Sequence, residues 1–150
     1  MSSKGRSKKP AAAFKPAIGK SIRGTAGADT IATMPFKWTS NGIDLDGPYG
    51  WKNLTAEVLL CSIIPKLHDF EKMTWGEIDG PTGSHFVDVT AITKDARKRL
   101  PQIGILDVDQ LFSLRITGKS RIWGIRDVAV LRVLWWDPEH LVCPSTLKHT

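Results

Sequence analysis

Apolar and polar residues alternate in three successive runs toward the C-terminus, centred on Leu114, Trp123 and Leu131. Side chains of a strand point to its two faces in turn, so a period of two over this length predicts β-structure. Only a few residues separate the runs, so their connections are expected to be tight turns. The pattern therefore predicts three strands that form an antiparallel meander.

Two upstream segments have apolar residues at helical spacing. In the first, Asn53 is the expected N-cap, and Pro65 either kinks the helix or starts a second one, because proline cannot donate inside a helix. In the second, Thr93 is the expected N-cap and Gly104 the stop. The apolar face expected in the first helix consists of Leu54, Val58, Leu60, Cys61, Ile64 and Leu67. The second helix is expected to bury Ala96, Leu100 and Ile103 and to expose Lys94, Arg97, Lys98 and Arg99.

Three shorter elements complete the expected fold. Residues 36–38 and 86–90 alternate like short strands, and Thr74 and Glu77 have the spacing of a capping box. Most helices precede the meander along the chain. The sequence thus predicts an α+β fold in which N-terminal helices pack on a C-terminal antiparallel sheet of three to four strands.

Charge is distributed unevenly along the chain. Residues 1–23 hold seven bases and no acid, and residues 1–33 as a whole have little apolar content. Such a segment cannot bury enough apolar surface to offset its ordering entropy, which predicts a flexible basic arm over 1–33 and a single domain over 34–150. The arm is either a solvated tail without a role or a segment that adds nonspecific affinity for nucleic acid.

The remaining composition is that of an ordinary globular domain. No apolar run approaches the roughly 20 residues that span a bilayer, and no secretory signal is evident, so a cytoplasmic protein without a membrane partner is expected. Cys61 and Cys143 are expected to be buried free thiols in a reducing compartment. Histidines with metal-ligand spacing and nucleotide-binding motifs are both missing, so neither a metal nor a small-molecule cofactor is expected.

Arginines recur along the predicted meander. On the third strand, Leu131, Val133 and Trp135 alternate with Arg132 and Leu134, and the set without the arginine is the expected core face. Arg115 lies on the open face of the first strand by the same reasoning. A row of guanidinium groups on one face suits phosphate, which it binds bidentately, although arginines also serve simply to solvate a sheet.

The position of Arg121 depends on the first hairpin. If Thr117 pairs with Ser120, Arg121 shares the core face, whereas pairing of Thr117 with Arg121 places Arg121 beside Arg115. Burial of an unpaired arginine is costly, which favours the second pairing. The aromatic residues nearby are expected either to stack on RNA bases or to belong to the core: Trp123, Trp135 and Trp136.

The residues of the meander resemble the toxins of type II toxin–antitoxin modules in the RelE/ParE/YoeB superfamily. The resemblance rests on the segment 113–117, on Arg121, on the apolar strand 128–136 and on His140. The ending IWGIRD…WWDPEH…KHT also resembles a group of short bacterial proteins of unknown role. The superfamily resemblance covers residues 54–140 and implies a RelE-like arrangement of helices and sheet.

The resemblance implies a metal-independent endoribonuclease that cuts mRNA on the ribosome and is held inactive by a cognate antitoxin. Its members let a ribose 2′-hydroxyl attack the neighbouring phosphate, which requires a base, an acid and cations. By position, the catalytic residues would be Arg121, Glu139 and His140. The RNA-binding residues would be Arg115, Lys119, Arg126, Arg132 and Trp136.

Other interpretations stay open. Asp137 to His140 form a structural corner if Asp137 caps the turn after the last strand. The chain is alternatively a non-enzymatic module that binds nucleic acid or protein through its basic tail and sheet face. A third interpretation is an unrelated small fold in which the arginines only solvate the sheet.

Overall fold

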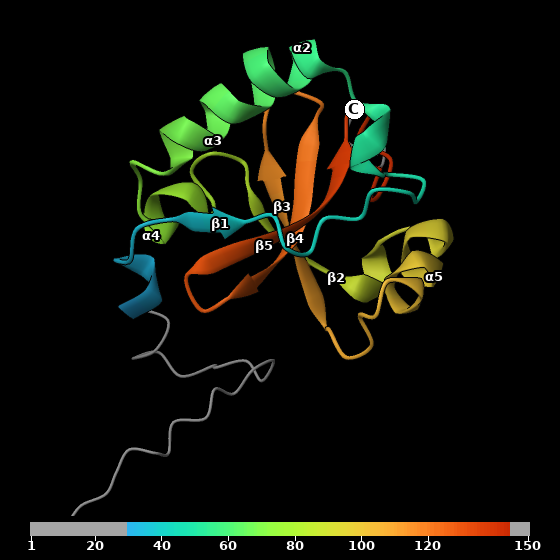
Figure 1. Ribbon diagram of the computed structural model, residues 1–150. Coiled ribbons are helices and arrows are strands. Elements are labelled where there is room, and N and C mark those ends of the chain that lie inside the picture. Colours follow the sequence, from blue (N-terminus) through green and yellow to red (C-terminus); the bar gives the residue numbers. More distant parts are fainter. Residues whose placement is uncertain (1–29, 145–150) are drawn as a thin grey trace, which may run out of the picture.

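The computed structural model describes residues 30–144, which form a five-stranded mixed sheet with helices on both faces (Figure 1). The strand order is β1-β5-β4-β3-β2; β1 pairs parallel with β5, and the other neighbours are antiparallel. The bounds are β1 Lys37–Thr39, β2 His85–Asp88, β3 Gln110–Arg115, β4 Arg121–Asp127 and β5 Val130–Asp137. The α+β class and the meander β3-β4-β5 are confirmed.

The expected strand count and direction are wrong. The two short apolar segments predicted at residues 36–38 and 86–90 both join the meander, one at each edge, which gives five strands. Because β1 joins β5 in parallel, the sheet is not purely antiparallel. Local patterning predicted these strands, but their partners are set by contacts between distant parts of the chain.

Helices cover the two faces of the sheet unequally (Figure 1). On one face, Ile63, Leu67 and Trp75 join Leu114 and Val133 of the sheet in one buried cluster. On the other face, Ala96 and Leu100 pack with Trp123 and Trp135 in a second cluster. The helical elements are η2 Trp51–Asn53, α2 Ala56–Val58, η3 Leu59–Ile63, α3 Ile64–Phe70, α4 Trp75–Ile78, η4 Val89–Ala91 and α5 Lys94–Gln102.

The elements α2, η3 and α3 form one continuous helical run. Its N-cap is Thr55, whose hydroxyl accepts from Val58 N at 3.1 Å, and not Asn53. At Pro65, which was expected to kink the helix or start a second one, the run changes from the π-helical turn η3 to α3, with the proline in the first turn of α3, where its missing N–H is tolerated. The buried stripe is narrower than expected, because Leu60 is 63% exposed and Ile64 39% exposed.

Several local predictions are confirmed at α4 and α5. Thr74 and Glu77 form the complete capping box at the start of α4. The Thr93 hydroxyl accepts from Ala96 N at 3.3 Å and caps α5, with Ala96 and Leu100 buried. Gly104 has φ of +85°, which glycine adopts readily, and follows the helix end.

A β-bulge on β5 changes which side chains face which core. The register with β4 shifts between Trp123 and Gly124, so Leu134 is the additional residue. Leu131, Val133 and Trp136 therefore join the first cluster, while Leu134 and Trp135 join the second. The expected alternation, with Trp135 on the face of Val133, is wrong because the bulge interrupts the period of two.

Alanine at Gly124 is expected to lower the free energy of unfolding by about 1–3 kcal/mol. A Cβ there would lie 2.5 Å from the carbonyl oxygen of Arg132 and 2.9 Å from Cδ1 of Leu131, so β4 and β5 would have to separate. Gly118→Ala is the matched control, because a Cβ at Gly118 meets nothing within 4 Å. Urea denaturation of both variants tests this, and equal stabilities would contradict the close packing of the bulge.

A buried ion pair joins α5 to the segment after β1. Asp44 is 5% exposed and accepts from Arg99 Nε at 2.9 Å and Nη2 at 2.8 Å. Its carboxylate also accepts from Trp135 Nε1 at 2.9 Å and Gly47 N at 3.3 Å. The hydrogen bonds from Arg99 are the main cause that lowers the pKa of Asp44, against the opposing effect of burial. Arg99 was expected to point outward, and this pair corrects that expectation.

Three expectations concern residues away from the sheet. Most of the expected basic arm, residues 1–29, lies outside the described residues, whereas Thr33 N and Met34 N already close a turn onto Thr30 O and Ile31 O. Cys61 is exposed and Cys143 half-buried, so the expectation of two buried thiols is wrong. Within residues 30–144, no helix has the length and apolar character needed to cross a membrane.

Candidate functional site

A hollow of about 300 Å³ lies where the β3–β4 hairpin meets the turn after β5. Its lining includes Lys119 and Arg121 from the hairpin and Glu139 and His140 from the turn. The structure thus brings the three residues expected to be catalytic and one expected RNA contact to the same place. The other lining residues are Gly118, Leu141 and Pro144.

The hairpin register places two arginines side by side. Arg115 pairs directly with Arg121, and Ile116 N donates to Ser120 O at 3.0 Å, which leaves a three-residue loop. The ladder forms neither pairing considered from the sequence, because Arg121 is opposite Arg115 and not opposite Thr117. As in the favoured pairing, Arg121 and Arg115 lie on the same face of the sheet.

Arg121 is largely withdrawn from solvent, with 9% of its surface exposed. Its Nη1 donates to the carbonyl oxygens of Thr117 at 3.1 Å, Gly118 at 3.3 Å and Ser120 at 3.1 Å. No carboxylate forms a salt bridge with it within residues 30–144. Burial lowers the pKa of the guanidinium, the neighbouring Arg115 lowers it further, and Asp137 acts in the opposite direction.

These surroundings favour an anion beside Arg121. Burial removes water from the Arg121 guanidinium, and Arg115 repels it, so both effects disfavour its positive charge. The carbonyl oxygens fix the guanidinium through one nitrogen, while Nε and Nη2 make no hydrogen bond within the described part of the chain. A phosphate oxygen in the hollow would supply both the missing hydrogen bonds and the opposite charge.

Asp137 builds the turn that carries Glu139 and His140. Its carboxylate is 1% exposed and accepts from Leu141 N at 2.8 Å, Val142 N at 2.9 Å and Trp123 Nε1 at 3.0 Å. The alternative in which Asp137 caps a structural corner is therefore confirmed. The same turn puts His140 at φ of +62°, a left-handed conformation that is uncommon outside glycine, and on the wall of the hollow.

A salt bridge crosses the mouth of the hollow. Lys119 Nζ lies 2.7 Å from Glu139 Oε1, and the two side chains are 63% and 59% exposed. An exposed pair of this kind contributes little to stability and exchanges its partners readily. Lys119 is therefore able to turn from Glu139 to a phosphate without a large free-energy change.

Of the other residues expected to bind RNA, Arg115 neighbours Arg121 without lining the hollow, and the rest lie elsewhere or are covered. Arg115 is exposed, and its Nε donates to Thr117 O at 3.3 Å. Arg132 pairs with Ile125 near the far end of β5, roughly 15 Å from Arg121 at the usual rise per residue, and its buried Nε has no partner within residues 30–144. A continuous row of Arg115, Arg121 and Arg132 is therefore not formed.

The two remaining expected RNA contacts face the first core. Arg126 stacks over the ring of Phe86 at 4.7 Å and that of Trp75 at 5.3 Å, and burial lowers its pKa. Trp136 is 8% exposed and lies 6.5 Å from Trp51, ring centre to ring centre. Trp123 and Trp135 are buried as well, so in this conformation none of the three tryptophans is open to stack on a base.

Sequence reasoning missed the backbone of the hairpin loop as part of the site. The hydroxyls of Thr117 and Ser120 lie 2.7 Å apart, and Thr117 Oγ1 accepts from Ser120 N at 3.1 Å. Hydroxyl residues that flank a glycine are typical of tight turns, which was the available signal. What the sequence did not show is that the loop carbonyls bind Arg121.

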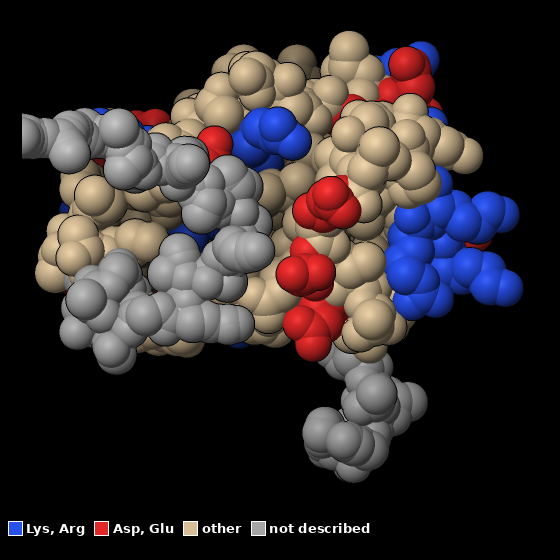
Figure 2. All heavy atoms as spheres, turned by 90° about the horizontal axis from the view of Figure 1, so that it is seen from below, with Lys and Arg blue, Asp and Glu red and all other residues tan. Residues whose placement is uncertain are grey.

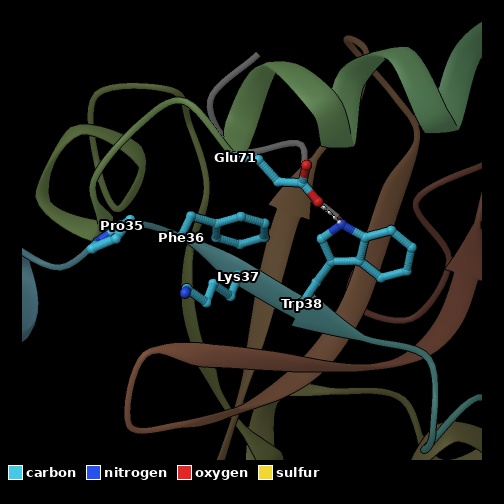
Figure 3. A pocket seen from close by; sticks show the side chains of 5 residues that line it. All are labelled: Pro35, Phe36, Lys37, Trp38 and Glu71. Atoms are coloured by element: carbon cyan, nitrogen blue, oxygen red, sulfur yellow. Dashed lines mark hydrogen bonds between the residues drawn. The ribbon is translucent and has the colours of Figure 1, made fainter.

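A second hollow, of about 470 Å³, lies at the edge strand β1 and is lined by Pro35, Phe36, Lys37, Trp38 and Glu71 (Figure 3). Trp38 Nε1 donates to Glu71 Oε2 at 2.6 Å, so the indole already binds this carboxylate. The hollow offers one cation and no histidine. Its chemistry does not suit the cleavage of a phosphodiester.

Comparisons of the chain with protein-family models, with curated proteins and with solved structures found no match. Within residues 30–144, no group of three or more histidine, cysteine or acidic side chains is placed to hold a metal ion. The hollow at Arg121, with the residue types that it gathers, is therefore the feature of the described residues that bears on function.

Proposed function

We propose that the protein is a metal-independent endoribonuclease of the toxin–antitoxin type that acts at the hollow of Arg121, Lys119, Glu139 and His140. The observation that carries the proposal is the meeting of two cations, a carboxylate and an imidazole in one hollow. These groups come from segments about 20 residues apart in the sequence. Cleavage of RNA without a metal needs a base, an acid and cations, and this combination of groups can supply all three.

The reaction would proceed by internal transfer. The 2′-hydroxyl of a ribose attacks the adjacent phosphorus while a base in the hollow, Glu139 or His140, takes its proton. The bond from phosphorus to the 5′-oxygen breaks, and the leaving oxygen takes a proton from the other group. The products are a 2′,3′-cyclic phosphate and a free 5′-hydroxyl, while Arg121 and Lys119 stabilise the charge that develops on the phosphate oxygens.

The wider features of the resemblance belong to the same proposal. The helices and meander would have a RelE-like arrangement. In the cytoplasm, mRNA on the ribosome would be the substrate. A cognate antitoxin would block the hollow with an acidic segment or with a helix laid across the arginines.

Binding of RNA without cleavage is the second candidate. Two observations favour it: Arg121 Nη1 is already occupied by three carbonyl oxygens, and Glu139 is paired with Lys119. A site of this kind would hold a phosphate firmly without supplying a free base. The two candidates differ in their products, so a single assay separates them.

Replacement of His140 by asparagine is expected to reduce RNA cleavage about 10²–10⁴-fold, the usual contribution of one acid–base group. Asparagine suits the test because it tolerates the left-handed conformation of residue 140 and cannot exchange a proton. The assay is gel analysis of an end-labelled RNA oligonucleotide in EDTA, with detection of cyclic-phosphate ends. Induced expression should arrest bacterial growth with the wild-type protein and not with His140→Asn.

His68→Asn provides the matched control, because His68 is an exposed histidine on α3, away from the hollow. It should cleave RNA and arrest growth like the wild-type protein. Binding of RNA by the wild-type protein without any cleavage would reject the nuclease and leave the binding module. Undiminished cleavage by His140→Asn would remove His140 from the chemistry.

A further inference from the structure

The helix α5 carries a cluster of cations that the hollow does not use. Lys94, Arg97 and Lys98 are exposed and have the i, i+3 and i+4 spacing of neighbours on one helical face. Figure 2 shows lysine and arginine side chains gathered at one end of the lower face of the molecule, on the side where α5 lies in Figure 1. A separate row of acidic side chains lies nearer the middle of that face.

These three cations are not explained by ion pairs. Within residues 30–144 none of them forms a salt bridge, and Arg97 instead donates to the carbonyl oxygens of Thr90 at 3.1 Å and Ile92 at 3.0 Å. The fourth cation of the helix, Arg99, is the one bound to Asp44. The three others therefore present their charge to solvent.

The position of Lys94 is unfavourable for the helix itself. Lys94 is the first residue after the N-cap, where the helix dipole disfavours positive charge. Its neighbours one turn on, Arg97 and Lys98, repel it, since like charges at this spacing destabilise a helix. Lys94 thus opposes local stability without a structural gain, which indicates a role outside the fold.

The platform beneath the cluster is rigid. Ala96 and Leu100 are buried in the second core, and Arg99 fixes the helix to Asp44 through two hydrogen bonds. Thr93 caps its start. The helix positions that carry the cations are therefore fixed relative to the body of the protein, which lowers the entropic cost of binding an extended polyanion.

We propose that the face of α5 formed by Lys94, Arg97 and Lys98 binds the phosphodiester backbone of RNA at a position distinct from the hollow. The ligand class follows from the chemistry, because three cations on one face of a rigid helix suit a chain of closely spaced phosphates. This inference rests on the proposed function for the identity of the polyanion. It adds a second contact that holds the substrate RNA and takes no part in the cleavage step.

The test compares wild-type protein with the double variant Lys94→Gln/Lys98→Gln, since glutamine has nearly the helix propensity of lysine. Fluorescence anisotropy with a labelled single-stranded RNA should show roughly three- to thirtyfold weaker binding. The slope of the logarithm of affinity against that of salt should fall by up to about 1.4, or about 0.7 for each lost phosphate contact. The melting temperature should stay unchanged or rise, because the helix loses its internal repulsion.

The matched control is Lys37→Gln/Lys72→Gln, which removes the same charge from two exposed lysines outside α5. It should leave affinity and salt slope close to those of the wild-type protein. Equal weakening by both double variants would overturn the proposal, because the effect would then reflect net charge. Unchanged binding by the α5 variant would also overturn it.

The α5 proposal and the nuclease proposal fail separately. Loss of cleavage in His140→Asn with an unchanged salt slope supports the hollow and leaves the α5 contact intact. If the wild-type protein binds RNA through α5 but never cleaves it, the nuclease is rejected and the α5 proposal stands. If cleavage depends on His140 and the α5 double variant binds RNA as tightly as the wild-type protein, the α5 proposal is rejected.

Discussion

Alanine in place of Asp44 is expected to lower the free energy of unfolding by about 3–5 kcal/mol, the usual result when one partner of a buried ion pair is removed. The substitution leaves the partly buried Arg99 guanidinium without its carboxylate and Trp135 Nε1 without an acceptor. Because α5 is held to the segment after β1 through this pair, the second core should loosen as well. Urea denaturation followed by tryptophan fluorescence measures the loss.

Asp46→Ala is the matched control, since Asp46 pairs with Lys52 on the surface and both side chains are more than 60% exposed. Removal of such a pair changes stability by no more than about 1 kcal/mol. Similar losses in the two variants would show that the buried pair has no special weight. A loss confined to Asp44→Ala would confirm the role of the pair.

The Asp44 pair also predicts a pH dependence. The pKa of Asp44 is lowered in the folded protein, so its contribution to stability is fully present above the unfolded value of about 3.9 and is lost as pH falls through the folded pKa. Asp44→Asn removes this titration. Its stability should therefore decline less steeply than that of the wild-type protein below about pH 4.

Alanine in place of Asp137 is expected to have the largest combined effect, a loss of at least about 3 kcal/mol in stability together with loss of RNA cleavage. Three donors, Trp123 Nε1 and the backbone N–H groups of Leu141 and Val142, would lose their acceptor, and unsatisfied buried donors cost about 1–3 kcal/mol each. The turn that holds His140 in the hollow would then be free to rearrange. Thermal unfolding and the RNA cleavage assay measure the two effects.

Two other variants of this turn separate structure from chemistry. Asp137→Asn keeps one good acceptor oxygen and should lose less stability than Asp137→Ala. Glu139→Ala, on the same turn but exposed, should change stability by less than about 1 kcal/mol. If Asp137→Ala were as stable as Glu139→Ala, the three hydrogen bonds would not hold the turn.

Local structure was largely predictable from local patterns. The meander, the capping box at Thr74 and the cap of α5 at Thr93 each depend on residues within a few positions of one another. The class of the fold followed from the order of these elements. The N-cap at Asn53 was wrong because Asn53 ends the separate 3₁₀ turn η2 and Thr55 offers the hydroxyl that caps α2.

Partner choice across the sheet was not predictable in this way. The parallel pairing of β1 with β5, the bulge at Leu134 and the pair of Asp44 with Arg99 join residues that are distant in sequence or depend on the register of a neighbouring strand. A single added residue moves every later side chain to the opposite face. The row of three arginines failed for related reasons, because Arg132 lies far along β5.

The sequence by itself determined the residue types of the candidate site, and its resemblance to the RelE/ParE/YoeB superfamily was the reason to name Arg121, Lys119, Glu139 and His140. Only the tertiary structure decided that these four line one hollow, that Arg126 and Trp136 are covered, and that Arg99 binds the buried Asp44. Residue type fixes charge and hydrogen-bonding capacity, which are local properties. Proximity and burial depend on how distant segments pack, and packing is set by the whole chain at once.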